Sequence, residues 1–196
     1  GTTLFLVDSQ LDGFSRGRNL DKIGQHAGDT SELYFSDVRT PASSVLGRVG
    51  GGFGHLMDEL PRERLALGVT AVGAAQGCIE QTIEYVQNRK AFGQAIGSFQ
   101  NTRFELARMK TDLEVNRAFV DHCAALYANG KLDVPTAAMV KLASTEMQCR
   151  VADGCLQLFG GYGYMTEYPI ARAFADARVQ RIYGGTSEIM KEVIAR

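Results

Sequence analysis

The pattern of hydrophobic and polar positions along the chain changes its period once, near residue 50. Before that point, apolar and β-branched residues form two short runs, residues 2–8 and 31–38, separated by a stretch rich in Gly, Asp and Arg. Short runs bounded by turn residues predict β-strands. Because an isolated pair of strands is only marginally stable, residues 1–50 are predicted to be a small β segment that cannot stand alone.

From about residue 53 the hydrophobic positions follow a helical period instead. Apolar residues alternate at spacings of four and three over residues 53–88, and they recur every seven residues from 99 to 127. These periods predict two long helices, each with one buried stripe. The first stripe consists of Leu65, Val69, Val72, Gln76, Ile79, Ile83 and Val86, and the second of Phe99, Leu106, Leu113, Val120 and Tyr127, with Met109 and Cys123 beside it.

A third long helix is predicted to begin behind Asp133, with Pro135 in its first turn, and to end at the glycines of residues 160–161. Two shorter helices are expected over residues 169–178 and from residue 187 onward. Long helices with short connections pack as antiparallel neighbours. The sequence therefore predicts a mainly α fold, an antiparallel helical bundle preceded by a small β-strand remnant.

The composition excludes several classes of function. Hydrophobic residues make up 45% of the 196 residues, enough for a substantial core, and the net charge of −1 offers no global field to attract nucleic acid or an anionic membrane. No window approaches the ~18 apolar residues of a transmembrane segment. The four cysteines lack C-x-x-C spacing and the three histidines are scattered. We therefore expect reduced core thiols, with no metal site and no disulfide framework.

Glycines cluster around residues 47–54, at the change of period. Their spacing does not follow a strand with the G-x-G-x-x-G register of a dinucleotide-binding loop. We interpret the cluster as a domain boundary.

Three other segments carry residues able to do chemistry. Residues 88–100 combine a guanidinium, aromatic rings and a carboxamide in a turn broken by glycines, which can hold a phosphate and stack on a ring. Residues 156–164 place Gln157 on the last helical turn before bare glycine backbone. Residues 181–189 place two glycines before a Thr/Ser helix cap, where free N–H groups can receive an oxyanion or a phosphate. Each segment is also consistent with an ordinary loop, helix stop or capped helix.

In this order and at this spacing, the segments resemble the flavin-dependent acyl-CoA dehydrogenases over essentially the whole chain. The phrases that carry the resemblance are GFSRGRNLDKIG, RKAFGQAIGSFQ, LQLFGGYGY and EYPIARAFADARVQRIYGGTSEIM. The resemblance implies that residues 1–50 are the remainder of the family's middle β-domain and residues 51–196 its C-terminal helical domain. It also implies that an N-terminal helical domain and part of the β-domain are missing, so we expect this chain alone to form a self-associating bundle that binds FAD poorly and is inactive.

The resemblance implies FAD as the cofactor and assigns it two sets of residues. Arg89, Phe92, Phe99 and Gln100 would help hold FAD, although Ala91 stands where some relatives carry a Thr. The ADP portion of a neighbouring subunit's flavin would meet Gln157, Gly160 and Gly161. Thr186 and Glu188 would also face FAD.

The catalytic base is the position where this chain departs from many relatives. Oxidising an acyl thioester between Cα and Cβ requires a carboxylate to remove the α-proton. In many members this glutamate follows the Tyr of an I-Y-x-G-T segment, but here the position is Gly184. In the isovaleryl-CoA and long-chain branches it comes from the first helix of the domain, one residue before an Arg. The resemblance therefore implies that Glu63 is the base, with Gly184 leaving space for its carboxylate.

Five residues are assigned to the substrate by the same resemblance: Arg62, Arg64, Tyr183, Gly184 and Gly185. Arg64 would steady the carboxylate and the substrate, the Gly184 N–H would polarise the thioester oxygen, and Tyr183 and Gly185 would line the acyl pocket. From the residues alone, Glu63 is better interpreted as an ordinary carboxylate of a helix's first turns, paired with Arg62 or Arg64, and only the resemblance favours the catalytic role.

The resulting hypothesis is an acyl-CoA dehydrogenase that makes trans-2-enoyl-CoA. It would pass electrons to an electron-transfer flavoprotein or similar acceptor and act as a homo-oligomer, a dimer or tetramer. The expected location is the cytoplasm of a bacterium or the mitochondrial matrix of a eukaryote. Two alternatives stay open: an acyl-CoA oxidase-like flavoenzyme on the same scaffold, and a non-catalytic helical oligomerisation or assembly domain. The length and branching of the acyl chain stay open as well.

Overall fold

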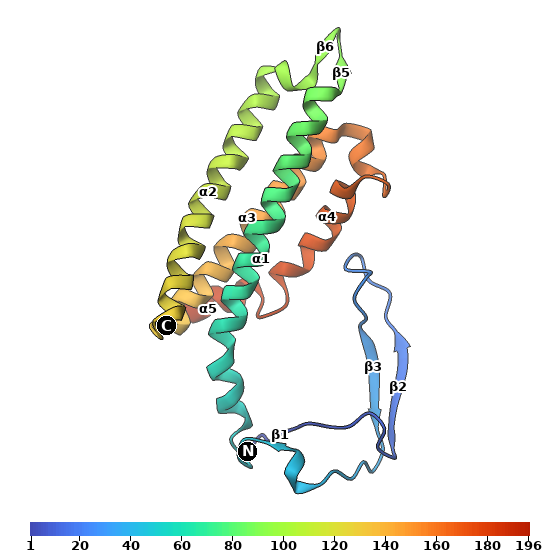
Figure 1. Cartoon of the computed structure of the whole chain (residues 1–196), viewed down its shortest axis with the longest axis vertical. Coiled ribbons are helices and arrows are strands. Elements are labelled where there is room, and N and C mark those ends of the chain that lie inside the picture. Colours follow the sequence, from blue (N-terminus) through green and yellow to red (C-terminus); the bar gives the residue numbers. More distant parts are fainter. The chain divides into compact units, whose positions relative to one another are not determined.

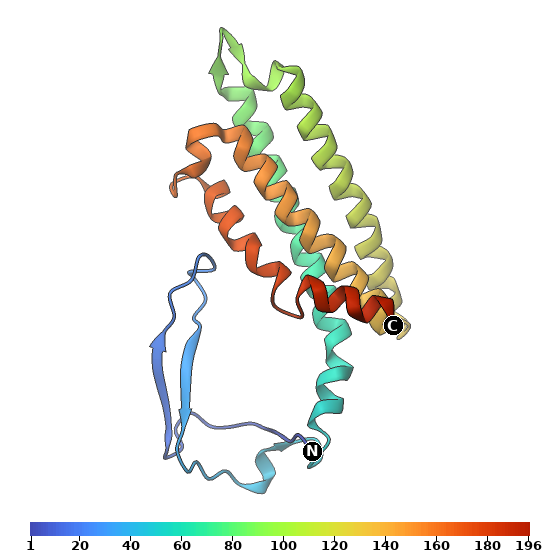
Figure 2. The ribbon, with the colours of Figure 1, turned by 180° about the vertical axis from the view of Figure 1, so that it is seen from behind.

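The computed structural model describes all residues, 1–196, and divides into two compact units, residues 1–60 and residues 61–196 (Figure 1, Figure 2). The first unit holds the β-strands that precede the helices, and the second holds the helical bundle. Helix α1 (Gly52–Asn88) begins in the first unit and continues into the second, with Pro61 inside it.

The first unit contains two small antiparallel sheets. Strand β1 (Leu4–Phe5) pairs with β4 (Val45–Leu46), and β2 (Phe14–Asn19) pairs with β3 (Ser31–Phe35) as a hairpin. A short 3₁₀ turn, Ala42–Ser44, precedes β4.

The strand predicted over residues 2–8 is shorter in the structure, because its partner β4 offers only two residues for pairing. Strand β2 was not predicted at all, since its sequence contains Gly and Arg and was interpreted as turns. The glycine has a packing reason. A Cβ on Gly17 would lie 2.7 Å from Cε2 of Tyr34 on the opposite strand, so only a glycine leaves room for that ring.

The second unit confirms the predicted helical bundle. Its three long helices run in alternating directions (Figure 1). Its elements after α1 are β5 (Lys90–Ala91), β6 (Gln94–Ala95), a 3₁₀ turn (Ile96–Ser98), α2 (Gln100–Ala128), α3 (Val134–Phe159), a 3₁₀ turn (Gly160–Tyr164), α4 (Pro169–Ala177), a 3₁₀ turn (Arg178–Arg181) and α5 (Ser187–Ala195).

The ends of α3 lie where the sequence predicted them. The Asp133 carboxylate accepts a hydrogen bond of 2.7 Å from the Thr136 backbone N–H, which satisfies one free donor of the first turn. Hydrogen bonding by the Thr136 side chain, and next by this N–H, lowers the pKa of the carboxyl. At the other end, Gly160 has φ +59°, a left-handed conformation that glycine adopts without steric cost.

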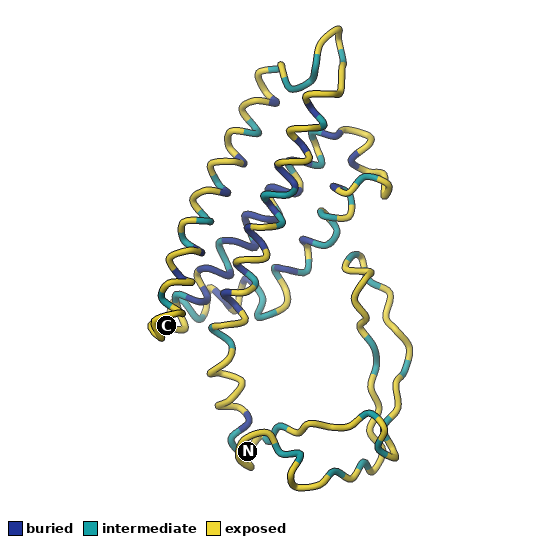
Figure 3. The backbone as a smooth tube through the Cα atoms, viewed as in Figure 1, coloured by how far each residue is buried: buried dark blue, intermediate teal, exposed yellow.

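Helix α3 is the centre of the bundle and packs against α2, α4 and α5. Buried positions in Figure 3 concentrate on the facing sides of the helices. The main core consists of Leu65, Val72, Ala75, Cys78, Ile79, Met109, Leu113, Val120, Cys123, Val140, Met147, Val151, Cys155, Phe159 and Ile170.

Three positions of the predicted stripes are exposed in the structure: Val69, Ile83 and Tyr127. The buried face of α1 instead uses small or polar residues at the helical spacing, including Ala75 and Thr82, which are both 0% exposed. A stripe defined by large apolar residues therefore missed part of the true contact face.

All four cysteines are free thiols, and three of them, Cys78, Cys123 and Cys155, are buried. Burial raises the pKa of Cys78 to about 12 and that of Cys155 to about 11. No group of three or more His, Cys, Asp or Glu side chains is placed to hold a metal ion. None of the helices combines the length and hydropathy needed to cross a membrane.

The core assignment predicts a contrast between two positions of α2. Leu113→Ala should lower the free energy of unfolding by about 2–5 kcal/mol, because the side chain is fully buried and a cavity would remain. Val115→Ala, at a position 65% exposed, should change it by no more than about 0.5 kcal/mol. Urea denaturation followed by circular dichroism measures both values, and equal losses would contradict the assigned core face.

Candidate functional site

The residues proposed from the sequence fall into two groups in the helical unit. One group surrounds the ends of α1 and α3, next to the β5–β6 hairpin. The other lies between the early turns of α1, the early turns of α3 and the loop of residues 182–186 that precedes α5. We call these the hairpin-end pocket and the glycine loop.

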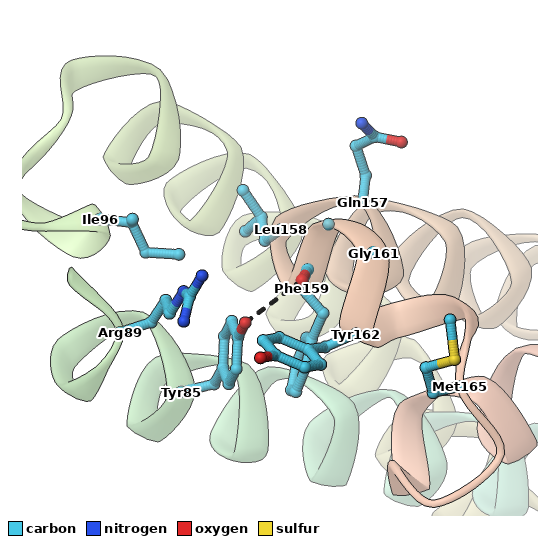
Figure 4. A pocket seen from close by; sticks show the side chains of 10 residues that line it. Tyr85, Arg89, Ile96, Gln157, Leu158, Phe159, Gly161, Tyr162 and Met165 are labelled. Carbon is cyan, nitrogen blue, oxygen red and sulfur yellow. Dashed lines mark hydrogen bonds between the residues drawn. The ribbon is translucent and has the colours of Figure 1, made fainter. Parts of the chain in front are cut away.

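The hairpin-end pocket has a volume of about 540 Å³. It brings together Arg89 from the end of α1 and Gln157, Gly160 and Gly161 from the end of α3, as Figure 4 shows. Its other lining residues are Tyr85, Ile96, Leu158, Phe159, Tyr162 and Met165.

Aromatic rings form one wall of the hairpin-end pocket. Tyr85 stacks on Phe159 with ring centroids 4.0 Å apart and planes 14° apart, and its hydroxyl donates a 3.3 Å hydrogen bond to the Phe159 carbonyl oxygen (Figure 4). Burial raises the pKa of the Tyr85 hydroxyl, while the nearby Arg89 charge opposes this rise. The Arg89 guanidinium carbon lies 5.2 Å from the Tyr162 ring centroid, a cation–π distance.

Glycine backbone forms another part of the lining. A Cβ built on Gly160 or Gly161 meets no atom within 4 Å, so the space beside both residues is open. Gln157 is exposed on the last turn of α3, and in Figure 4 its side chain points away from the rings. The pocket thus offers a cation, stacked rings and bare backbone, a combination suited to a phosphate-bearing ring compound.

The β5–β6 hairpin presents an aromatic ring at its tip. Phe92 and Gly93 both have positive φ, +51° and +80°, as a two-residue hairpin turn of the primed type requires. A bulky residue in this conformation is strained. Phe92 is also 95% exposed, and it makes an edge contact with Phe99 at 6.2 Å. Gln100 is exposed at the start of α2 and does not line the hairpin-end pocket.

The glycine loop has an unusual backbone. Gly184 and Gly185 have φ of +65° and +104°, and the Gly184 N–H donates to no acceptor within the chain. The loop ends at Thr186, whose hydroxyl oxygen accepts a 3.3 Å hydrogen bond from Ile189 N–H and caps α5. Glu188, exposed in the first turn of α5, has a lowered pKa because its own backbone N–H and the Thr186 hydroxyl stabilise the carboxylate.

Helix α3 holds the glycine loop through two charged side chains that the sequence analysis did not identify. Lys141 Nζ donates a 2.7 Å hydrogen bond to the Gly185 carbonyl oxygen. One oxygen of the Glu146 carboxylate accepts from Arg181 Nε and from the Ser187 hydroxyl, both at 2.8 Å. The available signal was Lys141 itself, the only charge in the otherwise uncharged run of residues 134–145.

On α1, the proposed base Glu63 is exposed and lies one helical turn before Leu67. Leu67 packs on the glycine loop, since a Cβ on Gly184 would lie 2.4 Å from Leu67 Cδ1. The missing side chain of Gly184 thus accommodates Leu67, and the role of Gly184 in leaving space for the Glu63 carboxylate stays a prediction. Glu63 and Leu67 share a helix face, which directs the Glu63 position toward the loop.

The two arginines beside Glu63 differ in burial. Arg62 is exposed, whereas Arg64 is only 5% exposed and its Nε has no hydrogen-bond partner. Burial lowers the pKa of Arg64, and the adjacent Glu63 charge opposes this effect. Tyr183 is 40% exposed, and partial burial raises the pKa of its hydroxyl.

These arrangements were compared with known proteins. The family described as "Acyl-CoA dehydrogenase, C-terminal domain" matches residues 50–196. The chain belongs to the acyl-CoA dehydrogenase family. Its sequence is 53% identical over 196 residues to the long-chain specific acyl-CoA dehydrogenase, mitochondrial, of Sus scrofa, covering 100% of this chain and 46% of that protein.

Two further acyl-CoA dehydrogenase relatives extend the comparison. Acryloyl-CoA reductase (NADH) of Anaerotignum propionicum is 40% identical and is matched over 100% of this chain and 50% of its own length. The crystal structure of acyl-CoA dehydrogenase from Geobacillus kaustophilus superposes with a TM-score of 0.96 at 45% identity, covering 99% of this chain and 51% of that chain. The chain thus spans about half the length of the curated relatives it matches.

Replacing glycine by alanine should have opposite effects on stability at Gly184, in the glycine loop, and at Gly73, on α1. Gly184→Ala should lower the free energy of unfolding by about 1–3 kcal/mol, because of its positive φ and the contact with Leu67. Gly73→Ala, at an exposed α1 position with no atom near its Cβ, should raise it by about 0.5–1 kcal/mol. Thermal and urea unfolding measure both.

A double variant separates the two causes at Gly184. If the Leu67 contact contributes, Leu67→Ala should cost less stability in the Gly184→Ala background than in the unaltered chain. Identical costs in the two backgrounds would show that the contact has no part in the effect.

Proposed function

We propose that the natural protein carrying this chain is an FAD-dependent acyl-CoA dehydrogenase that converts an acyl-CoA thioester to trans-2-enoyl-CoA. The observation that carries the proposal is the placement of Glu63 on the α1 face that packs, through Leu67, on the loop containing Gly184. This face brings a carboxylate and an unpaired backbone N–H to the same part of the helical unit.

The chain's own groups suit removal of a proton next to a thioester carbonyl. The Glu63 carboxylate takes the α-proton, and the Gly184 N–H donates to the thioester oxygen, which carries more negative charge as the proton leaves. Bound FAD supplies the acceptor for the β-hydrogen, which leaves as hydride. Tyr183 and Gly185 border the acyl chain in this arrangement, and Arg62 and Arg64 flank the base.

The hairpin-end pocket fits one part of FAD. The Arg89 guanidinium suits a phosphate, and Phe92 and Phe99, which lie outside the pocket lining, offer ring faces on the hairpin side. The open backbone of Gly160 and Gly161 admits close approach of a planar group, and exposed Gln157 offers a carboxamide to the ADP portion. Gln100, exposed at the start of α2, adds another carboxamide on the hairpin side.

A second copy of the chain completes the flavin site in this proposal. Glu63 lies on α1 and Arg89 directly follows its last residue, so a rise of about 1.5 Å per residue separates them by roughly 40 Å. Thr186 and Glu188, at the start of α5, belong to the glycine loop end and are proposed to face the flavin there. A homo-oligomer, a dimer or tetramer, lets the hairpin-end pocket of one copy meet the flavin that serves another copy's Glu63.

The similarity to a long-chain specific relative favours a long acyl chain as substrate. Electrons would pass to an electron-transfer flavoprotein or a similar acceptor. A mitochondrial matrix location follows if the source is a eukaryote, and a cytoplasmic one if it is a bacterium.

Glu63→Gln tests the base. In the complete natural protein, acyl-CoA-dependent bleaching of the flavin at saturating substrate should fall about 10²- to 10⁴-fold, because an amide cannot accept the α-proton. Stopped-flow absorbance with acyl-CoAs of graded length measures this rate and the preferred chain length. Glu84→Gln, an exposed glutamate on the same helix, is the matched control and should bleach at the wild-type rate.

Full activity of Glu63→Gln would remove the base assignment, and absence of bleaching in the wild type with every acyl-CoA would remove the function. Stoichiometric hydrogen peroxide release during turnover would instead identify an acyl-CoA oxidase.

Arg89→Met tests the cofactor site. Loss of the guanidinium should weaken FAD binding about 10- to 100-fold, as expected for a charge-assisted hydrogen bond. Isothermal titration of the complete natural protein, stripped of its cofactor, with FAD gives the dissociation constant. Arg103→Met, an exposed arginine on α2, should leave it unchanged, and equal weakening by both variants would contradict a specific role for Arg89.

A further inference from the structure

Lys141 is a buried cation at the centre of the bundle. Its side chain is 0% exposed, within a helix face that includes Ala137, Ala138 and Val140, also 0% exposed. Placing an ammonium group among such residues is costly unless it is hydrogen-bonded. Burial lowers the pKa of Lys141; the Glu146 charge opposes this change. A specific interaction is therefore expected to justify a lysine at this position.

That interaction is the hydrogen bond from Lys141 Nζ to the Gly185 carbonyl oxygen, at 2.7 Å. Both the ammonium and the neutral amine carry N–H donors, so the bond does not depend on the charge of the lysine. Because Lys141 lies 44 positions before Gly185 in the chain, the bond is a tertiary contact between α3 and the glycine loop.

The glycine loop needs such a contact to hold one conformation. Gly184 and Gly185 are consecutive residues with φ of +65° and +104°, and glycine has little intrinsic preference among conformations. Leu67 contacts the loop at Gly184, but an apolar contact does not orient a peptide group. The polar bond from Lys141 acts directly on the glycine pair.

The flanks of the loop are held independently of Lys141. The Glu146 carboxylate receives hydrogen bonds from Arg181 on one side of the loop and from Ser187 on the other. Thr186 also caps α5. Removing the Lys141 donor should therefore release the two glycines while both ends of the loop stay attached to α3.

The nearest charges balance only in part. Glu146 faces Lys141 with a negative charge, whereas Arg64 from α1 and Arg181 from the segment before the loop add positive charge. A cation retained in this setting costs stability, so its presence indicates a role other than stabilising the core.

We propose that Lys141 is a positioning residue whose hydrogen bond to Gly185 sets the direction of the Gly184 N–H toward the thioester oxygen. This inference rests on the proposed function, in which that N–H polarises the thioester. Lys141 touches neither the substrate nor the cofactor and acts only through the loop.

Lys141→Met tests the proposal, because methionine fills similar space without a donor. In the complete natural protein, the dissociation constant of acyl-CoA should change less than about threefold, while flavin bleaching at saturating acyl-CoA should slow about 10- to 100-fold. Amide hydrogen exchange over residues 182–187, measured by mass spectrometry without substrate, should accelerate at least about tenfold. The unfolding temperature should stay the same or rise.

Ser144→Ala is the matched control. Its hydroxyl is fully buried on the same helix and has no hydrogen-bond partner, so binding, bleaching and exchange should all keep wild-type values. Lys141→Gln keeps an N–H donor on a shorter side chain. Its bleaching rate and its amide hydrogen exchange should therefore lie between those of Lys141→Met and the wild type.

Three outcomes overturn the proposal: wild-type bleaching and exchange in both Lys141 variants, equal loss of binding and bleaching, or loss of cooperative unfolding in both variants. If none of the acyl-CoAs bleaches the flavin of the wild-type protein, the proposed function has failed. Unchanged amide hydrogen exchange over residues 182–187 in Lys141→Met then decides separately against the positioning role.

Discussion

The packing of the other helices around α3 is the constraint on which the rest of the helical unit depends. Helix α3 contacts α2, α4 and α5 directly and shares its apolar core with α1. A helix surrounded in this way must be apolar or small on most of its faces. Two of its charged residues then stand out, because Lys141 binds Gly185 in the glycine loop and Glu146 binds Arg181 and Ser187 on either side of it.

The same helix also explains why the candidate site has two parts. Its first turns hold the glycine loop, and its last turn ends at Gly160, in the hairpin-end pocket. Helix α1 carries Glu63 in its first half and is followed directly by Arg89. Long helices thus fix the spacing between chemical groups at a distance that loops could not maintain. In the proposed function, a second copy of the bundle brings the two parts to one flavin.

Much of the fold and part of the site could be predicted from the sequence, for identifiable reasons. Helix limits followed from local signals, such as the Asp133 cap and the glycine after Phe159, which act over a few residues. The pocket that joins Arg89 to Gly160 was not predicted, because the resemblance assigned these two residues to separate sets of FAD contacts. The hydrogen bond between Lys141 and Gly185 could not be predicted, because pairing across the fold leaves no periodic trace. Strand β2 was missed because its glycine is explained by side chains of the neighbouring strand, Glu32 and Tyr34, which local sequence does not reveal.

The buried thiols have a practical consequence. Cys78 and Cys155 have pKa values raised to about 12 and about 11 by burial within the bundle, so almost none of either is thiolate while the helices stay packed. Their reaction with an alkylating reagent then requires the bundle to open, and its rate reports that opening. Partly exposed Cys149 lies outside the apolar core. The alkylation rates of these two native thiols therefore measure how often the core of the bundle opens, without any engineered label.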